Sequence, residues 1–273
     1  MSKIDTDTMA EEGRYATRPD YGGSPSRTSV NLNGDAAVAN RDGGVTMFYA
    51  RISDCVESNG TVGIQSSIGS DDVLSWEQEE CRAWHTPLNY TSNRPVAWTP
   101  GVWDRATCRY QGSKLWTGGT LDDGSPEVLL LDGETGVVQQ TIAIPEIIGP
   151  TGLYGGAVDG DGHFWAIEVS GQTLVRVDRN TFAHQVWTPP VGGYGIAVDS
   201  VGRPWLCADS VSRFDPVLET WETAFVDSDH GGCMTDGNGT LWLAHNPLLG
   251  IDTNTLEIVK QWPLPGEIHG VSI

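Results

Sequence analysis

The sequence predicts an all-β protein built as a β-propeller, and three observations support this prediction. A motif of the form Asp-x-x-Gly-x-x-Trp recurs at a nearly constant interval, and a second turn motif recurs with it. The 273 residues include 34 Gly, 15 Pro and 11 Trp, a composition that suits short strands joined by tight turns. Because no segment sustains a helical apolar period over three turns, helices are not expected.

The first motif marks a turn between two strands. Aspartate and glycine favour the turn, and the tryptophan begins the bulkier strand that follows. The tryptophans of the three clear copies are 40 and 37 residues apart, and these copies are Asp159–Gly162–Trp165, Asp199–Gly202–Trp205 and Asp236–Gly239–Trp242. Weaker copies are Asn31–Gly34, with Ala37 at the tryptophan position, and the stretch that ends at Trp116. A period of about 40 residues predicts four-stranded blades.

The second motif is an apolar residue followed by Asp-x-x-Thr. It occurs at Val177–Thr181, Ile251–Thr255 and Leu131–Thr135, with Phe214–Leu218 as a looser copy. Asp178, Asp215 and Asp252 are 37 and 37 residues apart, so two independent markers share one period. These aspartates could bind calcium, but turn formation explains them better because an Asp side chain accepts hydrogen bonds from its own turn.

Residues 150–190 show how the strands of one blade follow from their residues. The small residues of Gly155–Val158 suit a crowded inner strand, and Asp159–Gly162 supply the first turn. The second strand, the third strand, the second turn and the outer strand are then expected at 164–167, 174–177, 178–181 and 182–187. Four short antiparallel strands that repeat in this way form a propeller blade.

The whole chain divides into such units, and we expect residues 1–273 to form one propeller domain. Five blades are expected at 26–92, 93–148, 150–190, 191–229 and 230–267. The chain begins with strands of a further blade at 1–20 and ends in an inner strand at 268–273, so the two ends would share that blade and leave no exposed edges. Because this blade lacks its second strand, the sequence predicts six blades or, as we favour, a fragment of a seven-bladed ring.

The first blade is long because residues 54–84 form an insertion. Its segment Glu57–Thr61 resembles a calcium loop faintly but lacks the acidic end of one, so a plain surface excursion is expected. The five cysteines leave at least one free thiol. Cys55 and Cys81 flank one polar segment, and we weigh a disulfide between them equally against five reduced cysteines.

Charge and hydropathy exclude several classes of function. With 16 basic and 36 acidic residues the net charge is −20, which suits neither a nucleic-acid partner nor an anionic membrane surface. No apolar run reaches the roughly 18 residues that a membrane span requires, and the N-terminus lacks the apolar core of a signal peptide. We expect an extracellular or periplasmic natural parent that binds a small-molecule, peptide or carbohydrate ligand.

Candidate ligand-binding residues lie where loops of several blades converge near a propeller axis. We expect these loops at the start of each inner strand and three residues beyond each tryptophan position. The first set includes Arg105, Tyr154, Tyr194, His230 and His269, and the second includes Asn40, Gly119, Glu168, Ala208 and His245. Three of the six histidines fall in these sets.

The histidines and the glutamate have two interpretations. A neutral imidazole at His230, His245 or His269 can abstract a proton, and the Glu168 carboxylate can hold a divalent ion or orient the base. Alternatively, the same side chains line a polar channel and bond to water. We weigh the two interpretations about equally for the whole cluster.

The remaining candidates are expected to bind substrate. Tyr154 and Tyr194 would stack on a ring of a ligand, or would simply plug the channel. Arg105 and Asn40 complete this set.

The repeat resembles that of the streptogramin B lyase (virginiamycin B lyase) group of propellers. The features that carry the resemblance are a His-Gly pair at the start of an inner strand and the Asp-x-x-Gly-x-x-Trp motif, most clearly over residues 150–273. The resemblance implies a ring-opening elimination assisted by Mg²⁺, two histidines and a glutamate. In this reaction a proton is removed and the ester oxygen leaves as a carboxylate.

The resemblance assigns roles by position. His230 and His269 would be the two histidines, with His269 as general base or acid. The matching glutamate would follow Ile273. The equivalent position is held by His245 in the preceding blade and by Glu168 two blades before His245.

Two functions from different classes follow. As an enzyme, the chain would be a carbon–oxygen lyase that opens a cyclic ester, with catalytic histidines and Mg²⁺ on Glu168. As a binding module, it would present a face to a ligand or protein without chemistry, because propellers host both. The sequence has no Gly-x-Ser-x-Gly, phosphate loop or zinc-type cysteine spacing, so serine hydrolases, nucleotide-dependent enzymes and zinc proteins are not supported.

Overall fold

The computed structural model describes residues 1–149, 151–169, 172–208, 210–226, 231–266, 268, 270 and 271. The chain divides into two compact units, one of Met1–Asp123 with Glu127–Thr141 and one of Gly124–Pro126 with Ile142–Ile273. Apart from the 3₁₀ turn η1 (Ile52–Asp54), the regular elements of the described chain are β-strands. Within these ranges, no helix is long and apolar enough to cross a membrane.

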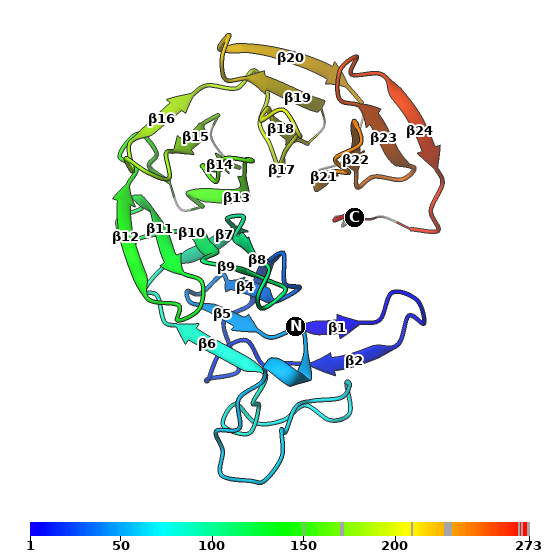
Figure 1. The fold of residues 1–273 in the computed structure, drawn as a ribbon. Helices are drawn as coiled ribbons and strands as arrows, with labels where there is room; N and C mark the ends of the chain where they lie inside the picture. The colour runs from blue at the N-terminus through cyan, green and yellow to red at the C-terminus, as the bar shows by residue number, and fades with distance from the viewer. Residues whose placement is uncertain are drawn as a thin grey trace. The chain divides into compact units, whose positions relative to one another are not determined.

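The first unit contains one four-stranded antiparallel sheet and most of a second (Figure 1). The first sheet has the strands β3 (Pro25–Val30), β4 (Ala36–Asn40), β5 (Val45–Phe48) and β6 (Arg82–Thr86). The second is formed by β7 (Ser92–Trp98), β10 (Lys114–Thr120), β11 (Pro126–Asp132) and β12 (Val138–Ala143). Two strand pairs complete the unit, β1 (Ser2–Ile4) with β2 (Glu11–Arg14) and β8 (Val102–Asp104) with β9 (Arg109–Gln111).

The second unit contains three four-stranded antiparallel sheets, each in simple chain order. They are formed by β13 (Leu153–Val158), β14 (Phe164–Glu168), β15 (Leu174–Val177) and β16 (His184–Trp187); by β17 (Gly195–Val198), β18 (Pro204–Cys207), β19 (Ser210–Asp215) and β20 (Thr220–Phe225); and by β21 (Cys233–Thr235), β22 (Thr240–Leu243), β23 (Leu248–Asp252) and β24 (Ile258–Trp262). The first strands β13, β17 and β21 contact one another in succession (Figure 1). Residues at the ends of these strands are therefore brought together.

The Asp-x-x-Gly-x-x-Trp motif forms a turn in which the aspartate carboxylate accepts hydrogen bonds from both the backbone and the tryptophan. Asp159 Oδ1 accepts the backbone N–H groups of Asp161 and His163 at 3.1 and 2.9 Å, and its Oδ2 accepts the indole N–H of Trp165 at 2.9 Å. Gly162 has a φ of +84°, a conformation that glycine adopts without strain. The copies at Asp199 and Asp236 repeat the same bonds.

The Asp-x-x-Thr motif also forms a turn. Asp178 Oδ1 accepts the backbone N–H groups of Asn180 and Thr181, both at 2.9 Å, and Phe182 then takes a φ of +59°. The aspartates are thus engaged in turns. Within the described ranges, no group of three His, Cys, Asp or Glu side chains could hold a metal ion.

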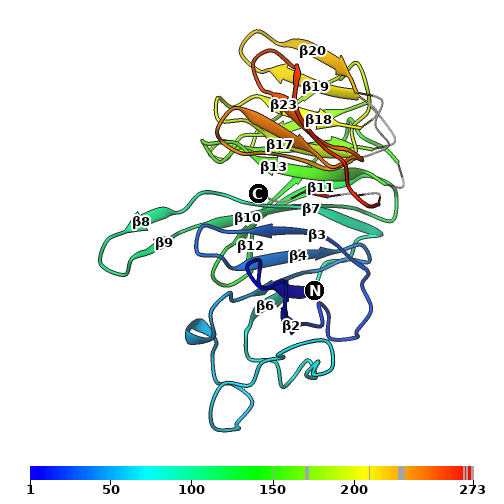
Figure 2. The same cartoon turned by 90° about the vertical axis from the view of Figure 1, so that its right-hand side faces the viewer.

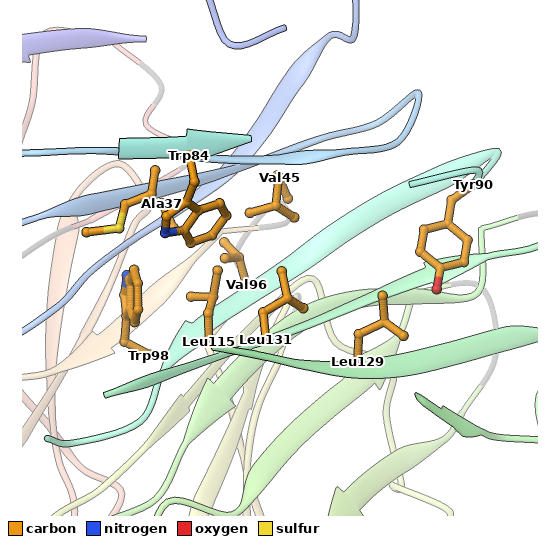
Figure 3. Close-up of a cluster of buried hydrophobic side chains, with 11 residues drawn as sticks. Ala37, Val45, Trp84, Tyr90, Val96, Trp98, Leu115, Leu129 and Leu131 are labelled. Atoms are coloured by element: carbon orange, nitrogen blue, oxygen red, sulfur yellow. The ribbon is translucent and has the colours of Figure 1, made fainter. Parts of the chain in front are cut away.

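Tryptophans form the core between neighbouring sheets. In the first unit, Trp84 of β6 and Trp98 at the end of β7 lie in one buried cluster with Leu115 of β10 (Figure 3). In the second unit, Trp165 contacts Phe214 of the next sheet, and Trp205 packs in a cluster with the leucines of β22. Trp165 and Trp205 are fully buried, as expected for residues packed between blades.

The cysteines form two disulfides, Cys55–Cys81 and Cys207–Cys233, and Cys108 is free and exposed. The interpretation of five reduced cysteines is therefore wrong. The first disulfide closes the long connection between β5 and β6, which has no strand of its own (Figure 2). The second joins β18 to β21, a link that the sequence did not suggest because these cysteines lie in different repeats.

The insertion is organised around a carboxylate rather than a cation. The Glu80 carboxylate accepts the backbone N–H groups of Ser58, Asn59 and Gln65 at 2.6, 2.9 and 2.8 Å. These bonds lower the pKa of Glu80. The segment that faintly resembles a calcium loop thus donates N–H groups to an anion, which agrees with the expected plain excursion.

The described residues include all of the N-terminal segment but only part of the C-terminal segment. Strands β1 and β2 form the strand pair expected within residues 1–20. The inner strand expected at 268–273 falls mostly outside the described residues, and residues 268, 270 and 271 are not in a strand.

Candidate functional site

Two tyrosines meet where the inner strands of adjacent sheets begin. Tyr154 is the second residue of β13, and Tyr194 immediately precedes β17. Their ring centroids are 5.3 Å apart with an interplanar angle of 51°. Both residues are half-buried, so the pair offers an apolar surface that retains solvent access.

Glu168 lies on β14, the strand that pairs with β13. It ends β14, where it pairs with Leu153, the residue before Tyr154. Its Oε2 accepts the hydroxyl of Thr173 at 3.0 Å, and its backbone N–H donates to the Thr173 carbonyl at 3.1 Å. The carboxylate is therefore held in place by a neutral donor while it remains half-buried.

A cavity of about 350 Å³ adjoins the tyrosine pair. Its lining includes Tyr194, Val191, Ala208 and Phe225, together with Val169, the residue after Glu168. These side chains are mainly apolar, although polar atoms supply nearly half of the lining, and Phe225 is 75% exposed at the end of β20. Such a volume lies at the lower end of the range for small-molecule pockets, so a larger ligand would enter it only in part.

The sequence did not identify Phe225 or the glycine loop of the cavity. Gly193 in that loop is closely packed, because a Cβ there would approach Ile167 Cδ1 to 2.9 Å and Leu206 Cβ to 3.2 Å. The available signal was Phe225 itself, a large apolar residue at the end of the outer strand β20.

His245 occupies the slot of Glu168 two sheets further along. It follows β22, three residues beyond Trp242, and is half-buried. Its Nδ1 is buried and has no hydrogen-bond partner among the residues that the structure describes. A buried ring nitrogen without a partner is uncommon, and this one is free to bond to a further group.

The two remaining histidine candidates, His230 and His269, lie outside the described residues. The magnesium site predicted with these histidines and a glutamate therefore stays a prediction. In the described part of the second unit, the Glu168 carboxylate accepts a hydrogen bond from the Thr173 hydroxyl, and no cluster of three metal-binding side chains exists there. Glu168 and Thr173 alone would leave most of the octahedral positions of a magnesium ion to other groups.

Asn40 has a structural setting in the first unit. It is fully buried at the end of β4, where its Oδ1 accepts the hydroxyl of Thr17 at 2.8 Å. Its Nδ2 donates to the carbonyls of Thr17 and Gly44 at 3.1 and 3.3 Å. The amide thus ties the N-terminal segment to the β4–β5 turn and faces protein rather than a ligand.

Arg105 does not lie at the start of an inner strand. The inner strand of its sheet is β7, which ends at Trp98, and Arg105 is an exposed residue in the turn of the β8–β9 hairpin. The prediction of its position was wrong because this hairpin is inserted where the other sheets have a tight turn. Gly119 holds the position three residues beyond Trp116 in this sheet. The space beside it is occupied by Tyr90, because a Cβ on Gly119 would overlap the Tyr90 ring.

Comparisons with known proteins identify the fold. No family model and no curated protein match the chain. Solved structures do match it. The catalytically inactive virginiamycin B lyase variant from Staphylococcus aureus with quinupristin has a TM-score of 0.61 at 12% identity, over 99% of this chain and 76% of that one.

Other solved structures match to a similar degree. A protein of unknown function from Bacteroides caccae has a TM-score of 0.60 at 11% identity, over 98% of this chain and 92% of that one. A chain of the nidogen/laminin complex has a TM-score of 0.60 at 7% identity, with the same coverage of 98% and 92%.

These likenesses, at identities of 7 to 12%, concern the fold. The chain is an all-β propeller of four-stranded antiparallel blades, which confirms the predicted fold class. The structural likeness to virginiamycin B lyase confirms the resemblance found in the repeat.

Proposed function

We propose that the chain binds a small organic molecule on the face that carries Tyr154, Tyr194 and Glu168. The observation that carries this proposal is the contact of the two tyrosine rings beside a cavity of about 350 Å³. A half-exposed aromatic pair beside a cavity, with a fixed carboxylate on the neighbouring strand, combines a stacking surface with one orienting polar group.

Size defines how such a ligand would lie. The cavity is at the lower end of the range for small-molecule pockets, so a larger molecule would insert one part of itself and extend across Tyr154 and Tyr194. The Glu168 carboxylate would accept a hydrogen bond from an N–H or O–H of the ligand. A cyclic ester with aromatic side groups meets these conditions, and quinupristin, present in the structure of the inactive lyase variant, is the first probe to use.

The binding experiment is a calorimetric titration of the whole chain with quinupristin. We expect Tyr194→Ala to weaken binding at least tenfold and Tyr194→Phe to weaken it less than threefold, because the ring is retained. Glu168→Gln should weaken binding about fivefold, and Trp103→Ala, an exposed change in the other unit, should leave it unchanged. Absence of binding, or equal binding by all four variants, would overturn the proposal.

A second candidate function is elimination at the bound ester, and the unpartnered Nδ1 of His245 favours it. In this reaction the imidazole takes a proton from the carbon next to the C–O bond, a C=C bond forms and the ester oxygen leaves as a carboxylate. The ring opens without consuming water. Product and substrate therefore have the same mass, whereas hydrolysis would add the mass of one water.

Mass spectrometry of the incubated ester separates the possible outcomes. A product of unchanged mass with a new carboxylate supports elimination, and His245→Gln should abolish it while leaving quinupristin affinity within twofold. A product heavier by one water, full activity in His245→Gln, or no product from a chain that binds the ester would each remove elimination and leave binding as the function.

A further inference from the structure

The first unit contains a separate cavity that the β8–β9 hairpin helps to enclose. It has a volume of about 420 Å³, and its lining includes Asp35, Tyr49, Trp98, Arg109, Tyr110 and Glu134. These residues come from the β3–β4 turn, the end of β5, the end of β7, the hairpin and the β11–β12 turn. The hairpin projects from β7 and β10 in Figure 2.

The hairpin is firmly attached beside this cavity. Tyr110 and Asn33 exchange two hydrogen bonds, from the Tyr110 backbone N–H to Asn33 Oδ1 at 2.9 Å and from Asn33 Nδ2 to the Tyr110 carbonyl at 2.8 Å. Arg109 bonds Asp54 at 2.5 Å. The hairpin replaces a tight turn and bonds to the neighbouring sheet. It therefore forms one wall of the cavity.

A buried carboxylate and a guanidinium face each other at a distance that is too long for a direct hydrogen bond. Asp35 is 3% exposed, and its Oδ1 and Oδ2 accept N–H groups of Ala50 and Asn31 at 3.0 and 3.2 Å. The Nη2 of Arg109 lies 3.8 Å from Asp35 Oδ2. A ligand hydroxyl between these groups could accept from the guanidinium and donate to the carboxylate.

Other polar groups of the lining have no partner in the described part of the chain. They are the Tyr49 hydroxyl, the Glu134 carboxylate and the hydroxyl of Ser113, whose oxygen is buried. Burial and the nearby Asp35 and Asp54 raise the pKa of Tyr49, so its hydroxyl keeps the proton and can donate. The cavity thus combines donors and acceptors with the aromatic side chains of Tyr49, Trp98 and Tyr110.

This combination selects the charge of a ligand. An anion would meet the carboxylates of Asp35 and Glu134, and a cation in the gap between Asp35 and Arg109 would meet the guanidinium. A neutral molecule with many hydroxyl groups satisfies both kinds of partner, and its C–H faces pack on aromatic rings. We propose that this cavity is a second binding site and that its ligand is a neutral mono- or disaccharide.

The test is saturation-transfer NMR of the whole chain with a panel of glucose, galactose, mannose, N-acetylglucosamine and their disaccharides. Glucuronate and glucosamine serve as anionic and cationic counterparts. The sugar with the strongest signal is then titrated by calorimetry. We expect a neutral sugar to bind at least fivefold more tightly than either charged one.

Variants locate the binding site. Tyr49→Phe removes only a hydroxyl and Glu134→Gln only a charge at an exposed turn, so both should keep the wild-type melting temperature and lower sugar affinity at least fivefold. Glu219→Gln, which alters a cavity of the other unit, is the matched control and should bind as the wild type does. No binding by any neutral sugar, a preference for a charged one, or unchanged affinity in both variants would overturn the proposal.

Discussion

The indole Nε1 of Trp205 donates a hydrogen bond to Asp199 Oδ2 at 3.0 Å, and Asp199 Oδ1 accepts the backbone N–H groups of Val201 and Arg203 at 3.1 and 2.9 Å. One carboxylate thus closes a turn and orients a fully buried tryptophan. The six-residue spacing is what lets both bonds form together, because the tryptophan sits on the strand that returns from the turn.

We predict that Trp205→Ala destabilises the protein by about 3–5 kcal/mol, because it removes a fully buried ring from between two sheets. Trp242→Ala should cost less, since Trp242 is only half-buried and stacks on Trp262, which is 49% exposed. Urea unfolding followed by far-UV circular dichroism measures both changes. Equal losses of unfolding free energy in the two variants would contradict the idea that Trp205 is the main core residue of its repeat. A loss below about 1 kcal/mol for Trp205→Ala would contradict it as well.

The repeat could be predicted from the sequence because its two motifs are local. Asp159 and Asp178 each bond to residues within six positions, so their chemistry can be recognised without knowing the fold. The phase of the second sheet could not be predicted. Its first turn is replaced by the β8–β9 hairpin, and nothing in the spacing shows that Arg105 belongs to that insertion rather than to an inner strand.

The candidate site was predictable only where sheets repeat regularly. Tyr154 and Tyr194 hold equivalent positions in successive sheets, and their rings do meet. Asn40 holds a slot equivalent to that of Glu168 but bonds to Thr17, a residue of the N-terminal segment. Partners of this kind are distant in sequence, so no periodicity could reveal them.

The two disulfides provide a matched comparison, because each spans a separation of 26 residues. The chain-entropy model therefore assigns about 3.5 kcal/mol to both. We predict that the Cys207→Ala/Cys233→Ala pair and the Cys55→Ala/Cys81→Ala pair each lower the free energy of unfolding by about 2–4 kcal/mol.

Guanidinium unfolding without reductant measures these losses, and Cys108→Ser is the control because this thiol is free and exposed. The control should stay within about 0.5 kcal/mol of the wild type. If dithiothreitol left the wild-type unfolding curve unchanged, the disulfides would contribute nothing and the prediction would be wrong.

Glu80 makes the insertion sensitive to acid. Its pKa is lowered by the backbone N–H groups of Asn59, Gln65 and Ser58, so the folded loop favours the charged carboxylate. This contribution is fully present above the ordinary glutamate pKa and is lost as the pH falls through the lower pKa of the folded state.

We predict that the amide signals of Ser58, Asn59 and Gln65 titrate together in ¹⁵N-edited NMR spectra, with a midpoint below pH 4.5, the ordinary value for glutamate. In Glu80→Gln this shared titration should disappear. A midpoint at or above the ordinary value, or three unrelated titrations, would show that the carboxylate is not the common acceptor.

Gly119 and Tyr90 lie against each other in the second sheet of the first unit, and their packing explains why this slot carries no side chain. Tyr90 is 9% exposed, and its hydroxyl donates to Glu127 Oε2 at 3.1 Å, so the ring is held at both ends. A Cβ on Gly119 would overlap this ring. We therefore predict that Gly119→Ala destabilises the protein by about 1–3 kcal/mol through overpacking.

A double-mutant cycle isolates this steric cause. Tyr90→Ala removes the ring and should itself cost about 3–5 kcal/mol, but Gly119→Ala added to it should cost little more, because the methyl group then enters the vacated space. Gly133→Ala is not a suitable control, since backbone and Trp98 atoms crowd that glycine as well. Gly192→Ala, where no atom lies within 4 Å of the new Cβ, is the matched control and should be nearly neutral. Equal costs of Gly119→Ala with and without the tyrosine ring would attribute the effect to the backbone instead.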